Sequence, residues 1–205
     1  MIAIIDYGAG NLRSVQKACE FLGAQAQITS DADTILSADR VILPGVGSFG
    51  DCMKNLNERH LTDTVRCAAR SSKPFLGICL GLQLLFESSE ESPGVDGLGV
   101  LKGKIARIPK TYGLKIPHMG WNSLSFKKET PIFKNLPENP FVYFVHSYYV
   151  QPNDKSVIAA TTQYGVELPV AVSSGNLFAT QFHPEKSGDT GLMILKNFIT
   201  AGGIG

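Results

Sequence analysis

The sequence predicts an α/β fold with an open mixed sheet, largely parallel, that has helices on both faces and an antiparallel strand set in its second half. In the first half, short and nearly continuous apolar runs alternate with helical patterns, which is typical of parallel strands buried on both faces. After Gly94 the strand-like segments are separated by turn residues, which indicates mixed or antiparallel pairing. Neither a repeat nor a low-complexity linker interrupts the chain, so we expect one domain over residues 1–205.

The chain is expected to begin with a strand and a helix. Residues 2–5 form an apolar run, and residues 8–11, which contain two glycines, form a turn. A helix is expected from Leu12 to Leu22, where apolar residues recur at helical spacing. Gly23 is placed to end this helix, because glycine readily adopts the left-handed conformation that closes one.

Three more strands and two more helices complete the predicted parallel part. The strands are expected at residues 25–29, 40–43 and 74–78. One helix is expected from Cys52 to Arg70, and a second from Leu80 to Phe86. In the second half, strand-like segments lie at residues 104–108, 141–145, 157–160 and 176–180, and a final helix is expected from about Gly191 to Thr200.

Composition and charge exclude several classes of function. The 19 Lys and Arg residues nearly balance the 18 Asp and Glu residues, giving a net charge of +1. Such a balance provides no long-range attraction to nucleic acid or to an anionic membrane. No apolar run approaches the roughly 20 residues of a membrane span, and the N-terminus is typical of a strand rather than a signal peptide. We therefore expect a cytoplasmic protein.

The four cysteines predict neither a metal site nor a disulfide. They are Cys19, Cys52, Cys67 and Cys79. No two of them form a Cys-x-x-Cys pair, and none has a histidine neighbour at metal-ligand spacing, so no zinc site is expected. Disulfides are rare in a reducing compartment. The ordinary role of each cysteine is that of a small buried apolar residue, and only the surroundings of Cys79 argue for another.

Cys79 lies in a segment with the pattern of a nucleophile elbow. The sequence Gly-Ile-Cys-Leu-Gly at residues 77–81 follows an apolar strand directly and precedes an apolar helix. A sharp strand-to-helix turn crowds the residues two before and two after the nucleophile, and glycine at both places removes that crowding. The amides of the following helix favour a thiolate at Cys79. The alternative is a buried cysteine in a glycine-containing turn.

The base for such a nucleophile is expected at His183. It precedes Pro184, which favours extended backbone at the residue before it. Positions two apart in an extended segment face the same way, so Glu185 can orient the His183 imidazole. The alternative is a strand end with two solvated polar residues. His60, which lies in a polar stretch that we expect to be helical, is predicted to be a solvated surface residue.

An oxyanion hole is expected at residues 44–47, Pro-Gly-Val-Gly, where a strand ends in a turn. Crevices at the carboxyl ends of strands are where ligands bind in open α/β sheets. An amide of this turn, at Val46 or Gly47, and the amide of Leu80 would together hold a developing negative charge on oxygen. A plain tight turn is the alternative interpretation.

Taken together, the segments at residues 44–47, 77–81 and 181–185 resemble the class I (triad) glutamine amidotransferases. The order Cys, His, Glu and the spacing match along essentially the whole chain. Three more segments, at residues 6–12, 117–122 and 143–148, resemble the branch that forms the glutaminase subunit of imidazole glycerol phosphate synthase. The sequence Pro-His-Met-Gly-Trp-Asn at residues 117–122 is the most discriminating of them.

This resemblance implies a mechanism. Cys79 attacks the side-chain amide of glutamine and forms a glutamyl thioester, His183 moves the proton, and Glu185 supports His183. Ammonia passes to a separate barrel-shaped cyclase subunit in a heterodimer, which makes imidazole glycerol phosphate and an aminoimidazole carboxamide ribotide in histidine biosynthesis. No cofactor and no metal are implied. Positions that match the glutamine site are Gly47, Gln83, Glu91, His146, Ser147 and Tyr148, and those that match the cyclase-facing surface are Trp121, Tyr143 and Lys186.

Some features stay open. Ala179 and Leu82 replace a common glycine and a common methionine of the family, which affects packing alone, and His118 and Trp121 also fit ordinary packing roles. Family members are often idle without the cyclase, which implies a peptide flip in the turn at residues 45–47. The alternatives are a class I glutaminase that serves another synthase, a catalytically silent binding subunit, and a cysteine peptidase or esterase.

Overall fold

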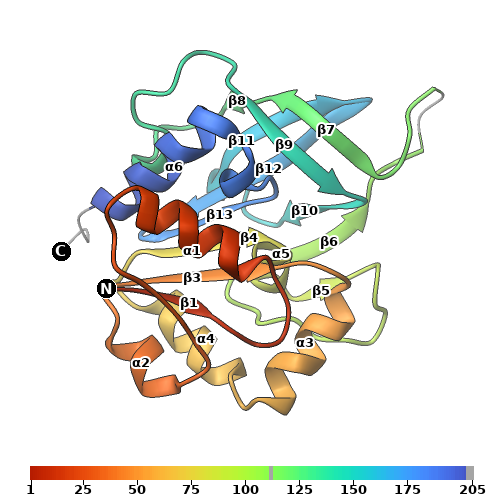
Figure 1. Ribbon diagram of the computed structural model, residues 1–205. Helices are drawn as coiled ribbons and strands as arrows, with labels where there is room; N and C mark the ends of the chain where they lie inside the picture. Colours follow the sequence, from red (N-terminus) through yellow and green to blue (C-terminus); the bar gives the residue numbers. More distant parts are fainter. Residues whose placement is uncertain (111–112, 202–205) are drawn as a thin grey trace.

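The computed structural model describes residues 1–110 and 113–201 and centres on an eight-stranded sheet (Figure 1). Residues 111–112 and 202–205 of the expected 1–205 unit lie outside the described residues. In spatial order the strands are β2 (Ala26–Thr29), β1 (Ile2–Ile5), β3 (Arg40–Gly45), β4 (Phe75–Cys79), β13 (Leu177–Thr180), β12 (Val166–Ser174), β11 (Ile158–Tyr164) and β8 (Ser125–Phe126). The strands from β2 to β13 pair in parallel, and the remaining pairs are antiparallel. The predicted fold class is confirmed.

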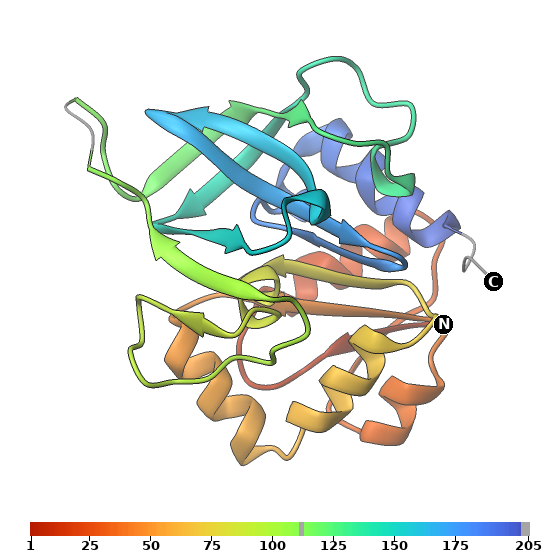
Figure 2. The same ribbon diagram turned by 180° about the vertical axis from the view of Figure 1, so that it is seen from behind.

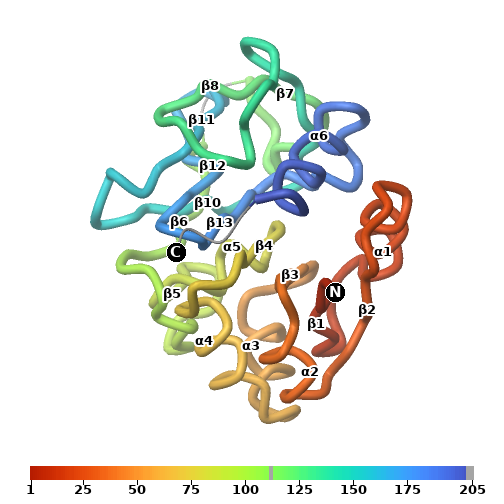
Figure 3. The backbone as a smooth tube through the Cα atoms, turned by 90° about the vertical axis from the view of Figure 1, so that its left-hand side faces the viewer, coloured from red at the N-terminus to blue at the C-terminus, as the bar shows by residue number. Residues whose placement is uncertain are grey.

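Helices cover both faces of the parallel strands. Helices α1 (Leu12–Phe21) and α6 (Gly188–Thr200) lie on one side, while α2 (Ala32–Ser37), α3 (Phe49–Glu58) and α4 (Thr62–Arg70) lie on the other (Figures 1 and 3). All residues of β1 and β4 are buried, because layers on both sides exclude water from the strands between them. This double cover explains why these strands are continuous apolar runs. The α5 helix (Leu80–Leu84) follows β4 without a gap.

Two smaller sheets flank the antiparallel half (Figure 2). One contains β10 (Tyr148–Pro152), β6 (Gly103–Arg107) and β5 (Ser88–Ser89), and the other contains β7 (His118–Ser123) and β9 (Phe141–His146). Short 3-10 turns, η1 (Pro131–Phe133), η2 (Lys155–Val157) and η3 (Pro184–Lys186), complete the described elements. The η3 turn follows β13, so it begins near the carboxyl end of the strand that pairs with β4.

The helix predicted from Cys52 to Arg70 is wrong, because the chain forms two helices there. Ser48 starts α3 early, and its hydroxyl accepts a hydrogen bond from the Asp51 amide at 3.3 Å. His60 adopts a positive φ of +56° and separates α3 from α4. The amide of the buried Leu61 then donates to the Leu56 carbonyl at 2.9 Å. His60 is exposed as expected but is not helical.

One further expectation is corrected, and several elements were not predicted. Cys67 is exposed on α4 rather than buried. The α2 helix was not predicted, although Asp31 caps it by accepting from the Thr34 amide at 2.7 Å. The β5, β7, β8, β10 and β12 strands were also missed, and Gly120 and Pro169 interrupt the strand pattern in β7 and β12. Within the described residues, none of the helices is both long and apolar enough to cross a bilayer.

Candidate active site

Cys79 sits at the junction of β4 and α5 in a strained conformation. Its φ is +55° and its ψ is −108°, which is costly for a residue with a side chain. A Cβ atom built on Gly81 would lie 1.8 Å from the Leu43 carbonyl oxygen, and one on Gly77 would lie 2.8 Å from the Gly81 carbonyl oxygen. Both glycines are therefore required by close backbone approach, which gives the turn the geometry expected of a nucleophile elbow.

His183 and Glu185 form a buried pair on η3. His183 Nδ1 lies 2.8 Å from Glu185 Oε1, and the two side chains are 2% and 1% exposed. The carboxylate accepts from Nδ1–H and leaves Nε2 as the second functional nitrogen. His183 Nε2 and Glu185 Oε2 are buried with no hydrogen-bond partner within the described part of the chain. Unpartnered buried atoms of this kind indicate a site that a substrate completes.

The charge state of His183 suits proton exchange with Cys79. Burial acts to lower the pKa of His183, but the nearby Cys79 sulfur and the Glu185 carboxylate outweigh it and raise this pKa from 6.5 to about 9. Because His183 Nε2 has no hydrogen-bond partner within the described residues, we attribute the effect of Cys79 on the pKa of His183 to electrostatic attraction. Cys79 and Glu185 therefore favour the protonated form of His183, which can donate a proton within the site.

Gln181 belongs to the segment at residues 181–185 and is a site residue to which no role was assigned from the sequence. Its Nε2 approaches Cys79 Sγ at 3.7 Å, and its Oε1 accepts from Gln83 Nε2 at 3.0 Å. Gln83 Nε2 also lies 3.4 Å from the Tyr148 carbonyl oxygen. A line of amides thus joins the Tyr148 carbonyl to the Cys79 sulfur, and Gln181 supplies the donor at its end. The position of Gln181 two residues before His183 is the only sequence signal for it.

The predicted oxyanion turn lies directly against the elbow. Gly45 is in register with Cys79, and a Cβ on Gly45 would lie 2.6 Å from Leu80 Cβ and 2.9 Å from the Gly81 nitrogen. Gly47 has a φ of +101°, which glycine adopts without strain. The structure therefore brings Val46, Gly47 and Leu80 to the same end of β3 and β4.

The other predicted glutamine contacts occupy two places around this end of the sheet. Glu91 Oε2 accepts from the Phe49 amide at 2.7 Å, beside Gly47 at the start of α3. His146, Ser147 and Tyr148 form the junction of β9 and β10, which the Gln83 amide joins to the elbow.

A buried histidine pair supports the junction of β9 and β10. His146 Nδ1 lies 2.9 Å from the Tyr148 carbonyl oxygen, and His118 Nδ1 lies 2.9 Å from His146 Nε2. Because a carbonyl only accepts, His146 donates to it from Nδ1 and accepts from His118 at Nε2. His118 also stacks on Phe144 and Tyr164, at ring distances of 4.6 and 4.0 Å. Burial lowers the pKa of His118 to about 4 and the pKa of His146 to about 3.

Acid is expected to destabilise the fold through this pair. Below pH 6.5 the two histidines take up protons in the unfolded chain, whereas in the folded chain they remain neutral until about pH 4 and 3. The free energy of unfolding should therefore fall as pH drops from 6.5 toward 4, by up to ~1.4 kcal/mol per pH unit for each histidine. Urea unfolding at pH 7 and pH 5 measures this slope.

Matched variants separate the pair from other titrating groups. His118→Gln should flatten the slope by about one proton, whereas His60→Gln, at an exposed position, should leave it unchanged. An equal slope in the wild-type chain and the His118→Gln variant would contradict the assignment.

The predicted cyclase-facing residues lie on another surface, formed by β7 and β9. Trp121 and Tyr143 are opposite each other in the register and meet edge to face, with ring centroids 6.2 Å apart. Lys186 is at the end of η3. The Tyr143 carbonyl accepts from the His183 amide at 3.1 Å, so this surface adjoins the backbone of His183.

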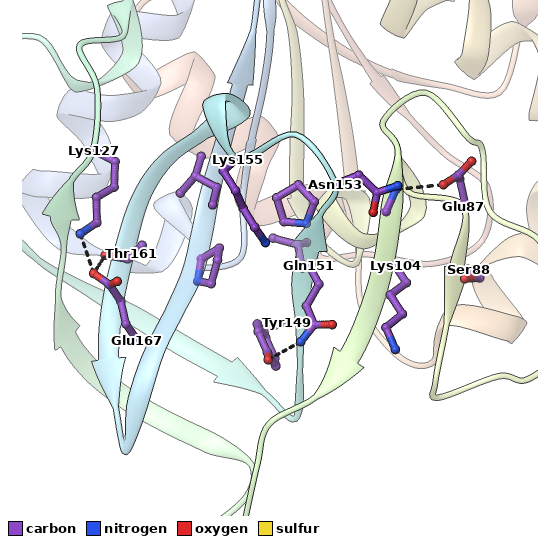
Figure 4. Close-up of a pocket in the computed structure, with 15 residues that line it drawn as sticks. Glu87, Ser88, Lys104, Lys127, Tyr149, Gln151, Asn153, Lys155, Thr161 and Glu167 are labelled. Atoms are coloured by element: carbon purple, nitrogen blue, oxygen red, sulfur yellow. Dashed lines mark hydrogen bonds and ion pairs between the residues drawn. The ribbon is translucent and has the colours of Figure 1, made fainter.

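A separate groove of about 1060 Å³ lies between the β6–β10 pair and the β11–β12 hairpin (Figure 4). None of Cys79, His183 and Glu185 lines it. Glu167 pairs with Lys127 at 2.5 Å, and Tyr149 accepts from Gln151 at 2.6 Å. The groove is thus distinct from the elbow. Among the described residues, no group of three or more His, Cys, Asp or Glu side chains is placed to hold a metal ion.

Comparison with known proteins gives a family match over almost the whole chain. The family described as "Glutamine amidotransferase class-I" matches residues 3–201. The chain is 52% identical to imidazole glycerol phosphate synthase subunit HisH of Caldanaerobacter subterraneus subsp. tengcongensis over 198 residues, covering 97% of each chain. It is 50% identical to subunit HisH of Methanocaldococcus jannaschii over 199 residues, covering 97% of this chain and 98% of the other.

Solved structures share the fold at lower identity. A structure described as PurLQS from Thermotoga maritima superposes with a TM-score of 0.76 at 22% identity, covering 97% of this chain and 96% of the other. A crystal structure described as glutamine amidotransferase superposes with a TM-score of 0.74 at 22% identity, covering 98% and 100%. These likenesses concern the arrangement of the strands and helices.

Proposed function

Because the chain belongs to the class-I glutamine amidotransferase family, we propose that it is a glutaminase that supplies ammonia to imidazole glycerol phosphate synthesis in histidine biosynthesis. The resemblance inferred from the sequence motifs is confirmed by the family match. The observation that carries the activity is a strained Cys79 elbow whose sulfur raises the pKa of His183 in the buried His183–Glu185 pair. A silent binding subunit would not need this triad, and the family match over residues 3–201 argues against a peptidase.

The proposed reaction converts glutamine and water to glutamate and ammonia through a thioester. The Cys79 thiolate adds to the side-chain carbonyl carbon of glutamine, and the amides of Val46 and Leu80 hold the resulting oxyanion. The intermediate collapses, the carbon–nitrogen bond breaks, and the His183 imidazolium protonates the departing ammonia. His183 then removes a proton from water, which attacks the thioester and releases glutamate and the thiolate. Glu185 holds the imidazole by its Nδ1–H throughout.

The partner proposed is the barrel cyclase subunit, in a heterodimer that receives ammonia. Its docking surface on this chain is the outward face of β7 and β9 with Lys186. Trp121 is 54% exposed there, and Met119 and Phe141 on the same two strands are 62% and 58% exposed. Large apolar side chains gathered on one exposed face support a protein–protein contact. Sequence reasoning missed Met119 and Phe141, whose exposure depends on how the strands pair.

The test is glutamate release from glutamine by the purified chain, alone and with the cyclase subunit and its ribotide ligand. We expect strong stimulation in the mixture. Full activity of the chain alone would indicate a free-standing glutaminase. An inactive mixture with this cyclase, but an active one with another synthase, would reassign the acceptor.

Trp121→Ala is expected to weaken binding of the cyclase subunit by about 10- to 100-fold, because a half-exposed aromatic at the centre of a contact contributes much of its affinity. Titration calorimetry measures the change in Kd. Phe21→Ala is the matched control, since Phe21 is 78% exposed on α1, away from the β7–β9 face. Equal losses of affinity for the two variants would contradict the proposed surface.

The pH profile should have its alkaline limb near the raised pKa of His183. Since this pKa is about 9, the imidazolium persists through neutral pH and is lost as pH rises past 9. The value of kcat/KM should then fall, because the proton donor for ammonia is gone. Glu185→Gln removes a charge that raises the pKa and should move the limb to lower pH. An unmoved limb in this variant would contradict the role of Glu185.

A further inference from the structure

Two buried polar side chains hold the back of the oxyanion turn. Tyr7, which follows β1, donates its hydroxyl to the Pro44 carbonyl at 2.8 Å. Cys52, on α3, donates its thiol to the Val46 carbonyl at 3.5 Å. The Tyr7 oxygen and the Cys52 sulfur are themselves 3.7 Å apart. Tyr7 is 0% and Cys52 is 1% exposed, so both lie in the core behind the turn rather than in the glutamine site.

These two bonds fix alternate peptide groups of the turn. The Pro44 carbonyl belongs to the Pro44–Gly45 peptide, and the Val46 carbonyl belongs to the Val46–Gly47 peptide. Between them lies the Gly45–Val46 peptide, which carries the Val46 N–H. That N–H is the donor proposed for the oxyanion. The hydrogen bonds from Tyr7 and Cys52 therefore anchor the peptide groups on either side of this amide, and so restrict the orientations that the amide can adopt.

The packing around the turn leaves one side tight and the other open. A Cβ on Gly45 would lie 2.7 Å from the Tyr7 hydroxyl and 2.6 Å from Leu80 Cβ, so the turn fits closely between Tyr7 and the elbow. A Cβ on Gly47 would meet nothing within 4 Å. A hollow of about 590 Å³, lined in part by Val46, Gly47 and Cys52, borders that open side. Without the anchors, the turn has room to move away from Cys79.

We propose that Tyr7 and Cys52 are positioning residues for glutamine hydrolysis, whose hydrogen bonds to the Pro44 and Val46 carbonyls fix the two peptides on either side of the Val46 amide, so that this amide can serve the oxyanion site in the active complex. The inference rests on the proposed glutaminase function and assigns to these residues no contact with glutamine. Their effect is exerted in the transition state, because only there does the negative charge develop on oxygen.

Tyr7 and Cys52 are both suited to act as hydrogen-bond donors at neutral pH. Burial raises the pKa of Tyr7 well above its ordinary value and also raises the pKa of Cys52, although the nearby Tyr7 hydroxyl acts against the second shift. Both groups therefore keep their protons through neutral pH. A side chain that only filled the core would need no donor, and Phe or Ala would serve equally at these places.

The first measurement is steady-state glutamine hydrolysis by variants in complex with the cyclase subunit. Removing an oxyanion donor outright commonly costs about 10²–10³ in kcat, and loosening it should cost a part of that. We expect Tyr7→Phe and Cys52→Ala to lower kcat by about 10-fold, with KM changed less than about twofold. Cys52→Ser keeps a donor of similar size and should recover part of the loss. A rise in KM at unchanged kcat would overturn the proposal.

The second measurement separates the turn from the nucleophile. Alkylation of Cys79 by iodoacetamide requires the thiolate but develops no oxyanion, so its rate, followed on the Cys79 peptide by mass spectrometry, should be unchanged in all three variants. Thermal unfolding should confirm that the variants are folded at the assay temperature. A parallel fall of alkylation and turnover would overturn the proposal in favour of general damage to the site.

The other possible results of the kinetic comparison also test the proposal. Unchanged kcat in both Tyr7→Phe and Cys52→Ala would overturn the role, and Cys52→Ser no better than Cys52→Ala would overturn the donor role of Cys52. If the wild-type complex itself fails to hydrolyse glutamine, the proposed function fails, and that result is distinct from any failure of the variants relative to an active wild type.

Discussion

Replacing Cys79 by alanine is expected to lower glutamine hydrolysis by at least ~10⁴-fold. The variant keeps the oxyanion turn and the His183–Glu185 pair but has no atom that can form the thioester. Since the two remaining parts act on an intermediate that no longer forms, their contributions are lost with the nucleophile. Glutamate release in the presence of the cyclase subunit measures the loss, and binding of the cyclase should be unaffected.

Cys67→Ala is the matched control for this experiment. Cys67 is a free thiol exposed on α4, whereas Cys79 is a free thiol buried at the elbow. The control should retain full turnover. Residual turnover above about 1% in Cys79→Ala, far beyond what the other parts of a triad site support without their nucleophile, would exclude covalent catalysis by Cys79.

Replacing Gly81 by alanine is expected to have the largest effect on stability. The added Cβ would lie 1.8 Å from the Leu43 carbonyl oxygen, which is backbone of the neighbouring strand β3. Because β3 and β4 are buried on both faces, neither strand has room to yield, and the free energy of unfolding should fall by ~3 kcal/mol or more. Any folded fraction should be inactive, since the elbow must shift. Urea unfolding and the activity assay measure both effects.

Gly23→Ala provides the comparison for this prediction. Gly23 ends α1 with a φ of +81°, and a Cβ there would meet nothing within 4 Å. Gly23→Ala should therefore lower the free energy of unfolding only by the cost of a positive φ for alanine, about 1–2 kcal/mol. If Gly81→Ala were no more destabilising than Gly23→Ala, the close approach between Gly81 and β3 would be refuted.

The parallel half of the fold and the positions of the three proposed triad residues were accessible from the sequence because their signals are local. Continuous apolar runs marked β1, β3 and β4, and the spacing of Gly77, Cys79 and Gly81 marked the elbow. The pair His183 and Glu185 followed from a two-residue spacing after Pro184 was considered. In each case a short segment contains the whole physical cause, whether it is double burial, a sharp turn or a shared face.

The features that were missed depend on distant partners. The break between α3 and α4 depends on the positive φ of His60. No side chain caps the start of α4, so the sequence has no capping signal for this break. Gln181 acquires its place only because β13 lies beside β4. Tyr7 and Cys52 meet behind the oxyanion turn from two elements 45 positions apart in sequence. Such contacts come from tertiary packing, so composition and periodicity do not contain them.

The central claim is that Cys79 is the nucleophile toward glutamine, and an affinity label tests it most directly. A diazoketone analogue of glutamine, incubated with the complex and followed by peptide mass mapping, should modify one residue per chain. The account predicts that this residue is Cys79, that excess glutamine blocks the reaction, and that loss of turnover parallels labelling. Inactivation with the label on another residue, or full labelling with turnover intact, would contradict it.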